Sequence, residues 1–303
     1  MIIRKEERDG NIYYYIEHSF RLDGKILKKE KYLGKVIPKN IERIKRDFLY
    51  EIYKEKWYSK FELIKSAFDK EQKNMPSEAI EKYIESFMIK FTYDTQKIEG
   101  STLNFRDTAN LLLENRTPPN KPIKDVKEAE EHKKIFYELL KTKKDINLNL
   151  VLEWHYKLLK ETKQNIAGKI RNHQVAISGS RFIPPSPSEL NALLTDFIKW
   201  YNKTKSKLNP VELAALVHLK FVTIHPFTDG NGRISRLLMN FVLNKHRFPM
   251  LNIEYKNRSS YYTALERSQI KHNESPFVQW FFKRYLKNNK VYINNVSKKS
   301  KVL

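Results

Sequence analysis

The sequence contains no cysteine in its 303 residues, so it can form neither a disulfide nor a thiolate metal site. No run approaches the ~20 apolar residues of a membrane-spanning helix. The opening residues, Met1–Lys5, are not followed by the apolar stretch of a signal peptide. We therefore expect a cytoplasmic protein with no membrane partner. Glycine is also scarce, with eight residues in all, so closely spaced glycines need a structural reason.

Acidic residues are outnumbered: 58 Lys and Arg stand against 35 Asp and Glu, which gives a net charge of +23. Such an excess attracts polyanions, whether nucleic acid, ATP or an acidic protein, although solvated surface lysines would give the same number. Apolar residues make up 40% and charged residues 31%, a balance typical of a globular protein rather than a disordered one. The length allows one large or two small domains.

The first 35 residues differ from the rest because they are rich in aromatic and β-branched residues. Turn signals at Asp9-Gly10 and Asp23-Gly24 separate three strand-like runs, which predicts an antiparallel meander over 2–8, 12–20 and 25–33. Basic residues alternate with aromatic ones here. This pattern fits a nucleic-acid or partner surface, and it fits equally a small sheet that packs on helices.

Helical periodicity dominates from Pro38 onward, so the predicted fold class is mainly α. We expect a long helix over 41–69 with a break near Ser59, and a polar linker over 70–76. The later helices are expected at about 77–98, 105–115, 126–141, 148–162, 188–201, 211–223, 234–243, 257–270 and from 276. The predicted organisation is a small β-meander over 1–35, a helical linker region over 36–75, a principal domain over 76–286 and a basic tail over 287–303. The charged stretch from Glu128 to Lys134 reads as a solvated helix face.

A polar segment, His225-Pro-Phe-Thr-Asp-Gly-Asn-Gly-Arg-Ile-Ser-Arg236, separates two apolar helical runs. The first amides of a helix have no internal partner and carry partial positive charge. Two glycines just before the second helix let an anion approach the main chain, so the segment predicts a phosphate-binding nest. Asp229 fits such a nest as a ligand of Mg²⁺, and His225 has a suitable pKa for a general base. The plain alternative is a glycine-containing turn with a core histidine.

The same segment resembles the signature of the Fic family, and every fixed position of the family pattern is present. The resemblance implies a Fic-type helical bundle with a short β-hairpin flap, and the activity of a protein adenylyltransferase. Such an enzyme moves AMP from ATP to a Ser, Thr or Tyr hydroxyl of a protein, itself included. It further implies His225 as the general base and Asp229 as the Mg²⁺ ligand. The implied nucleotide-binding residues are Asp229, Gly230, Asn231, Gly232, Arg233, Arg236, Tyr262 and Gln269.

A second resemblance concerns Thr95-Gln-Lys-Ile-Glu99-Gly100, at the end of the helix predicted near 79–99. Read alone, this is a helix C-terminus, where Glu99 is unfavourable unless a cation accompanies it. The segment is similar to the inhibitory motif of Fic proteins. It lies N-terminal to the signature segment in the same chain, as in the family's second regulatory class. The resemblance implies that Glu99 pairs with Arg236 and keeps it from the γ-phosphate of ATP.

Two short β-prone runs around Ser178-Gly179-Ser180 predict a hairpin, which resembles the Fic flap that docks a target segment by strand addition. Its residues are Val175, Ala176, Ile177, Arg181, Phe182 and Ile183. Several alternatives stay open: an enzyme that removes AMP as well as or instead of attaching it, transfer of UMP, GMP or a phosphocholine-type group in place of AMP, and a nucleic-acid-associated regulator that uses its basic charge. The sequence also leaves open a homodimer.

Overall fold

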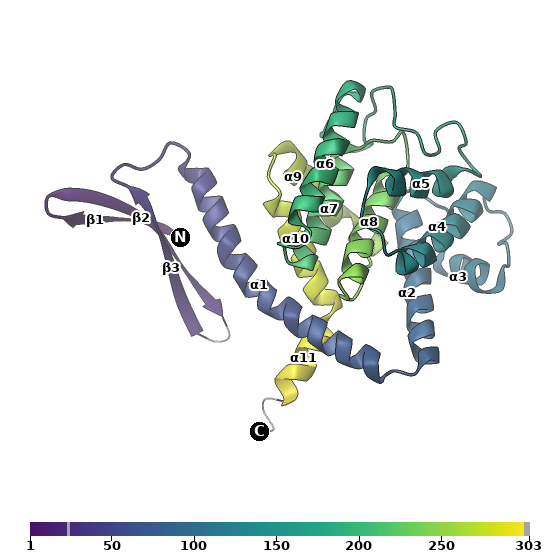
Figure 1. The fold of residues 1–303 in the computed structure, drawn as a ribbon, viewed down its shortest axis with the longest axis horizontal. Helices are drawn as coiled ribbons and strands as arrows, with labels where there is room; N and C mark the ends of the chain where they lie inside the picture. The colour runs from purple at the N-terminus through teal and green to yellow at the C-terminus, as the bar shows by residue number, and fades with distance from the viewer. Residues whose placement is uncertain (23–24, 300–303) are drawn as a thin grey trace. The chain divides into compact units, whose positions relative to one another are not determined.

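The computed structural model describes residues 1–22 and 25–299 (Figure 1). Its contacts divide the chain into two compact units, Met1–Leu63 and Ile64–Leu303. The predicted fold class is confirmed, because within the described residues a three-stranded antiparallel sheet precedes eleven α-helices. None of the described helices is long and apolar enough to cross a lipid bilayer.

The sheet of the first unit has the order β1-β2-β3, with β1 at Ile2–Arg8, β2 at Asn11–Leu22 and β3 at Lys25–Gly34. These bounds lie close to the three predicted runs. Asp9 and Gly10 join β1 to β2 with φ of 50° and 72°, the left-handed pair of a two-residue hairpin turn. The second predicted turn, Asp23-Gly24, lies outside the described residues.

The middle strand of this sheet carries an apolar patch on one face, beside Lys31 of β3. Ile16 and Phe20 of β2 pack with Phe48 and Ile52 of the long helix α1, which spans Ile41–Asn74. On β1, Arg4 forms ion pairs with Glu6, Glu17 and Glu30. These carboxylates neutralise part of the positive charge on the strands, which weakens the case for a polyanion-binding surface there.

Two expectations for α1 are wrong. The helix continues without a break past Ser59, and it runs through the predicted linker to Asn74. The sequence of α1 contains neither glycine nor proline, and Ser59 bonds back to the Lys56 carbonyl while the helix goes on. The helix ends just before Pro76, as the restriction on residues that precede proline predicts.

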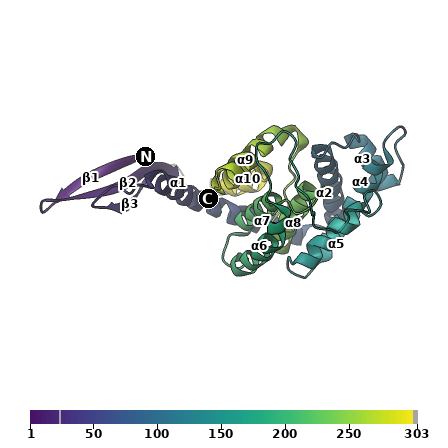
Figure 2. The same ribbon diagram turned by 90° about the horizontal axis from the view of Figure 1, so that it is seen from above.

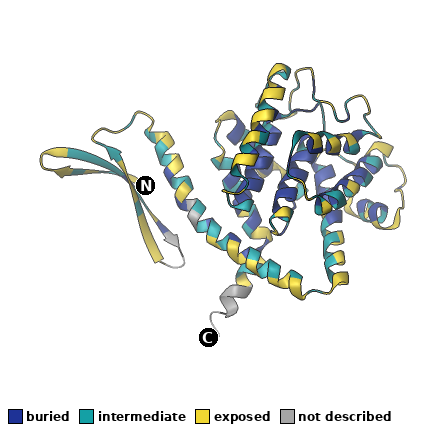
Figure 3. Cartoon of the chain, in the orientation of Figure 1, coloured by how far each residue is buried: buried dark blue, intermediate teal, exposed yellow. Residues whose placement is uncertain are grey.

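The second unit is a helical bundle around a central pair, α7 and α8, which lie side by side in both views (Figures 1 and 2). Nearly all of α7 and α8 is buried, as Figure 3 shows, because α6 and α10 pack against α7 while α2, α4 and α5 pack against α8. Such enclosure makes α7 apolar around most of its circumference, whereas α8 also buries polar side chains, including Arg233 and Arg236. The helices are α2 (Ser77–Ile98), α3 (Phe105–Glu114), α4 (Ile123–Lys141), α5 (Leu148–Leu159), α6 (Leu190–Thr204), α7 (Pro210–Ile224), α8 (Asn231–Lys245), α9 (Arg258–Ile270), α10 (Ser275–Asn288) and α11 (Lys290–Lys299).

The predicted tail is helical over most of its described length, because α11 follows α10 after a single residue. Tyr292 of α11 donates a 2.6 Å hydrogen bond to Glu71, and its ring meets the edge of Phe68. The predicted solvated face of α4 is also wrong in part. Glu128, Glu131 and His132 are buried, since α4 packs against α2, α5 and α8.

The predicted β-hairpin is absent. Ser178 and Gly179 do form a turn, closed by the Ser180 amide on the Ile177 carbonyl at 3.1 Å, but the flanking residues of the described segment form no strand. A strand ladder needs free amides on facing residues. Pro184 and Pro185 have none, and the Arg181 amide donates to the Glu266 carboxylate at 2.7 Å instead.

Candidate active site

The predicted polar segment is a turn between the two buried central helices. His225 ends α7 in the left-handed region at φ 52°, with its amide bonded to the Phe221 carbonyl at 3.1 Å. Gly230, at φ 85°, precedes the first residue of α8. Asn231 closes the turn, because its side chain accepts from the Phe227 amide at 2.9 Å and donates to the Phe227 carbonyl at 2.8 Å. The carboxamide of Asn231 is therefore committed to the turn, and only its main-chain amide stays available for an anion.

His225 lies half-buried at the end of α7. Its Nδ1 is 3.2 Å from the Val222 carbonyl, so Nδ1 carries the proton and Nε2 keeps a lone pair. Burial lowers the pKa of the imidazole, against an opposing contribution from the Val222 hydrogen bond. The ring is thus neutral at physiological pH, which is the form that a general base requires.

His155 of α5 packs against the turn and stabilises it. Its ring stacks on Phe227 with centroids 3.6 Å apart, and its Nε2 donates to the Asp229 carbonyl at 2.9 Å. Its Nδ1 accepts from the Gly168 amide at 2.9 Å. A Cβ at Gly230 would come within 3.2 Å of this ring, so glycine is needed there for the close approach as well as for its φ. His155 is a supporting residue that the sequence pattern did not identify as such.

Asp229 is the only predicted metal ligand. Its carboxylate pairs with Lys163 and with Arg233 at 3.0 Å, and it accepts from the Gly230 amide at 2.5 Å. Burial would raise the pKa of Asp229, but Arg233 and Lys163 lower it well below its ordinary value. Asp229 is therefore ionised throughout the physiological range.

This carboxylate fits the way in which proteins bind Mg²⁺, with one or two carboxylates while substrate phosphates complete the shell. Its side chain is 32% exposed, so a cation has access to it. Within the described part of the chain, no group of three or more His, Asp or Glu residues is placed to hold a metal by itself. An ion at Asp229 would therefore depend on oxygen ligands from the nucleotide.

Arg233 is almost fully buried, at 2% exposure, and it has a partner that the sequence did not reveal. Besides Asp229, its guanidinium pairs with Glu128 of α4. Thr162 donates to the same carboxylate at 3.0 Å, and Gln96 of α2 donates to the Glu128 carbonyl at 2.9 Å. The Nε–H of Arg233 is buried without an acceptor in the described structure, which is rare for a buried donor.

Arg236 meets the predicted partner Glu99 at the C-terminal end of α2. The Nη2 of Arg236 lies 2.5 Å from the Glu99 Oε1, and the guanidinium also donates to Thr95 at 3.3 Å. The Glu99 carboxylate lies directly against the first turn of α8, because a Cβ at Gly232 would come within 2.3 Å of Oε1. A carboxylate thus occupies the very place where the sequence predicts phosphate oxygens.

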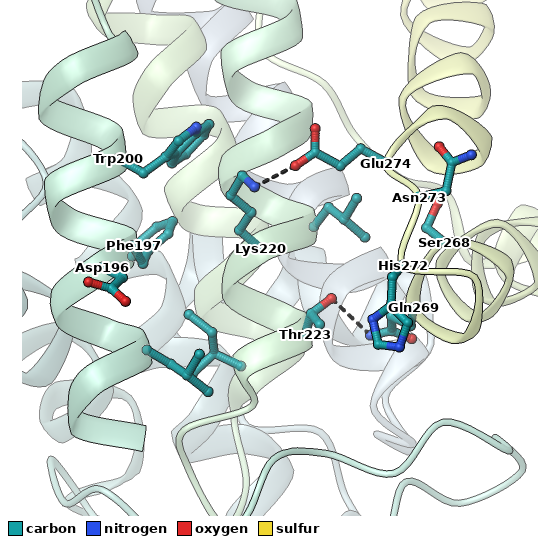
Figure 4. A pocket seen from close by; sticks show the side chains of 13 residues that line it. Asp196, Phe197, Trp200, Lys220, Thr223, Ser268, Gln269, His272, Asn273 and Glu274 are labelled. Carbon is teal, nitrogen blue, oxygen red and sulfur yellow. Dashed lines mark hydrogen bonds and ion pairs between the residues drawn. The ribbon is translucent and has the colours of Figure 1, made fainter. Parts of the chain in front are cut away.

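The two candidate base-contact residues lie on α9. Tyr262 is 46% exposed and donates to the Ile98 carbonyl at 3.2 Å, beside Glu99. Gln269 is buried and donates to Thr223 at 3.3 Å, at the wall of a cavity of about 390 Å³ bounded by α6, α7 and the end of α9 (Figure 4). The structure places Tyr262 at the end of α2 and Gln269 at the end of α7, through separate hydrogen bonds.

Comparison with known proteins agrees with the geometry. Residues 145–243 match the Fic/DOC family. The protein adenylyltransferase fic-1 of Caenorhabditis elegans is 32% identical over 213 residues, which is 68% of this chain and 41% of that protein. The chain therefore spans about two fifths of the length of this relative.

Solved structures give the same result. Residues 134–508 of C. elegans Fic-1 superpose with a TM-score of 0.70 at 28% identity, covering 84% of this chain and 75% of that one. A Fic domain containing signaling protein from Bacteroides thetaiotaomicron superposes with a TM-score of 0.68 at 28% identity, covering 76% and 95%. The sequence motif, the turn between α7 and α8 and these similarities agree, and the chain belongs to the Fic/DOC family.

Proposed function

We propose that this protein transfers AMP from ATP to a hydroxyl group of a protein, and that Glu99 represses the reaction. One observation carries the proposal. The amides at the start of α8 have no side-chain cap, the Nε–H of Arg233 in the first turn of that helix has no acceptor among the described residues, and the turn before them holds His225 with its Nε2 unprotonated. Donors of this kind bind phosphate oxygens, and an imidazole lone pair beside them accepts a proton. The names of the relatives support this reading.

In the proposed reaction, the hydroxyl oxygen of the target attacks the α-phosphorus of ATP, while Nε2 of His225 takes the proton. The bond from the α-phosphorus to the bridging oxygen breaks, and pyrophosphate leaves. Arg233, held between Asp229 and Glu128, stabilises the charge that builds on the phosphates. Mg²⁺ held by Asp229 would supply further charge neutralisation to the phosphates.

The loop over 172–186 is the proposed docking site for the target. It is not a preformed hairpin, but much of it is exposed, including Ile183 at 78%. Glu266 of α9 holds it through the Arg181 amide and the Ser180 hydroxyl. We propose that a target segment pairs with the main chain of this loop.

Repression follows from the position of Glu99. Its carboxylate occupies the space over Gly232 and takes the Arg236 guanidinium. The γ-phosphate of ATP and this carboxylate compete for one cation, so nucleotide binds unproductively while Glu99 stays in place.

Removal of AMP by the same site is a second candidate function. The position of Glu99 favours it, since a carboxylate beside the amides at the start of α8 is placed to orient a water molecule toward a modified target.

The test uses ATP labelled on its α-phosphate, with wild type, Glu99→Gly and His225→Ala in a cell lysate. We expect label in protein with Glu99→Gly, less with wild type and none with His225→Ala, since general-base catalysis contributes roughly 10²–10⁴-fold. Equal labelling by Glu99→Gly with and without His225 would overturn the proposal. Loss of label from a pre-modified target on addition of wild type would favour the removal reaction.

A further inference from the structure

Arg171 lies between α5 and the 172–186 loop and is 3% exposed. Its guanidinium donates to three main-chain carbonyls: Nε to His225 at 2.9 Å, Nη1 to His173 at 2.9 Å and Nη2 to Pro185 at 2.6 Å. Its own amide donates to the Pro226 carbonyl at 2.9 Å. A single side chain therefore joins the base candidate to both ends of the loop.

The charge of Arg171 is unusual for its position. Within residues 1–22 and 25–299 its guanidinium forms no ion pair with a carboxylate, and burial lowers its pKa. A buried charge without a counterion is costly, and carbonyls could be satisfied by neutral donors. What a guanidinium alone offers is a rigid planar fork that fixes several acceptors in one geometry.

The three carbonyls belong to parts that must act together. His173 and Pro185 flank the segment 174–184, and Gln174 closes its base by donating to the Pro184 carbonyl at 2.9 Å. The third acceptor is the carbonyl of His225 itself. The distance between the loop and the imidazole is thus set at Arg171.

We propose that Arg171 is a positioning residue that holds the stem of the 172–186 loop and the main chain of His225 in one frame. A hydroxyl held by the loop is thereby delivered to the Nε2 of His225. The inference rests on the proposed function, but the link between loop and histidine can be tested without activity.

The variants are Arg171→Met, which keeps the length and loses the donors, and Arg171→Lys, which keeps the charge but not the fork. Lys169→Met is the matched control, because it removes an exposed cation two residues away. All are made in the full chain with Glu99→Gly. Three quantities are measured: the rate of self-labelling from α-labelled ATP, equilibrium binding of a non-hydrolysable ATP analogue, and the rate of tryptic cleavage after Arg181.

We expect Arg171→Met to slow labelling by on the order of 10²-fold, the usual result of misplacing a reacting group by about 1 Å. Analogue binding should change by less than about threefold, since a positioning defect acts on turnover rather than on nucleotide affinity. Cleavage after Arg181 should accelerate, Arg171→Lys should lie between, and Lys169→Met should match its parent. Thermal unfolding identifies any variant that fails to fold, and Arg171→Lys then decides.

Unchanged labelling in a folded Arg171→Met variant would overturn the inference, as would a loss of analogue binding that accounts for the slower rate. Unchanged cleavage after Arg181 would refute the tie to the loop. If the Glu99→Gly parent shows no labelling at all, the proposed function has failed, and cleavage still decides whether Arg171 holds the loop.

Discussion

Replacement of Glu99 by glycine tests whether the carboxylate over α8 restrains the site. Around the turn, three carboxylates (Glu99, Glu128 and Asp229) face three cations (Lys163, Arg233 and Arg236). Removing Glu99 leaves one cation in excess, and the nearly buried Arg236 loses its only carboxylate among the described residues. A hydrogen bond to a charged group contributes ~1.5–3 kcal/mol. At ~1.36 kcal/mol per tenfold change, the productive binding of ATP should strengthen by about 10- to 150-fold.

The measurement is a titration of labelling rate and of ATP binding for wild type and Glu99→Gly. Glu114→Gly is the matched control, since Glu114 is also a carboxylate at the end of a helix but pairs with Arg116, two residues away, and not with a residue of the site. The effect should disappear in an Arg236→Ala background, because Glu99 acts through that guanidinium. A rise that persists without Arg236, or no rise at all, would refute the reasoning.

Three further predictions follow from the same contacts. Because burial lowers the pKa of His225, its neutral form persists as pH falls through ~6.5; kcat/KM for transfer should stay constant there and fall only at lower pH, and a midpoint at or above that value would contradict the assignment. Glu128→Ala leaves Arg233 with Asp229 alone, and breaking a buried pair costs roughly 3–5 kcal/mol; urea unfolding should show a loss toward the lower end, while the partly exposed Glu130→Ala should show little. Lys163→Gln frees Asp229 from a partly exposed ion pair that contributes ~0.2–1 kcal/mol; Mn²⁺ binding in the presence of ATP, followed by electron paramagnetic resonance, should strengthen by about 1.5- to 5-fold, with Lys160→Gln unchanged.

Local sequence signals predicted the parts of the site that depend on neighbouring residues. The turn between α7 and α8 follows from two apolar helical runs around a polar segment, and its motif places His225, Asp229 and Arg236 together. The pairing of Glu99 with Arg236 joins residues 137 positions apart, and it could be predicted only because a second motif and an unfavourable charge at a helix end pointed to it.

The missed residues are those whose partners lie in distant elements. Glu128 stands among other charged residues, so its sequence context predicts a solvated face. Yet it shares a stripe of helical spacing with His132, Ile135 and Leu139, all of them buried, and that stripe was the available signal. Arg171 had no such signal, because its acceptors are main-chain carbonyls that any sequence would supply.

The prediction of a β-hairpin flap is wrong for a different reason. Val175, Ile177 and Ile183 have high β-propensity, but propensity describes how well a residue fits a pleated, half-buried surface. The loop is largely exposed, the described residues of the second unit contain no strand, and a side chain of α9 takes one of its amides. Strand formation there would require a partner strand that the described residues of the second unit do not supply.

Gly232 is important to the site because it has no side chain. The hollow over its Cα now holds a carboxylate oxygen, and an added Cβ would collide with it. If that hollow also admits a phosphate, its two guests exclude one another by volume as well as by charge. Alanine at this position would then displace both the Glu99 carboxylate and the phosphate. A substitution of Gly232 would therefore relieve inhibition without allowing the nucleotide to bind. Relief of inhibition with binding intact would require movement of Glu99 at the end of α2.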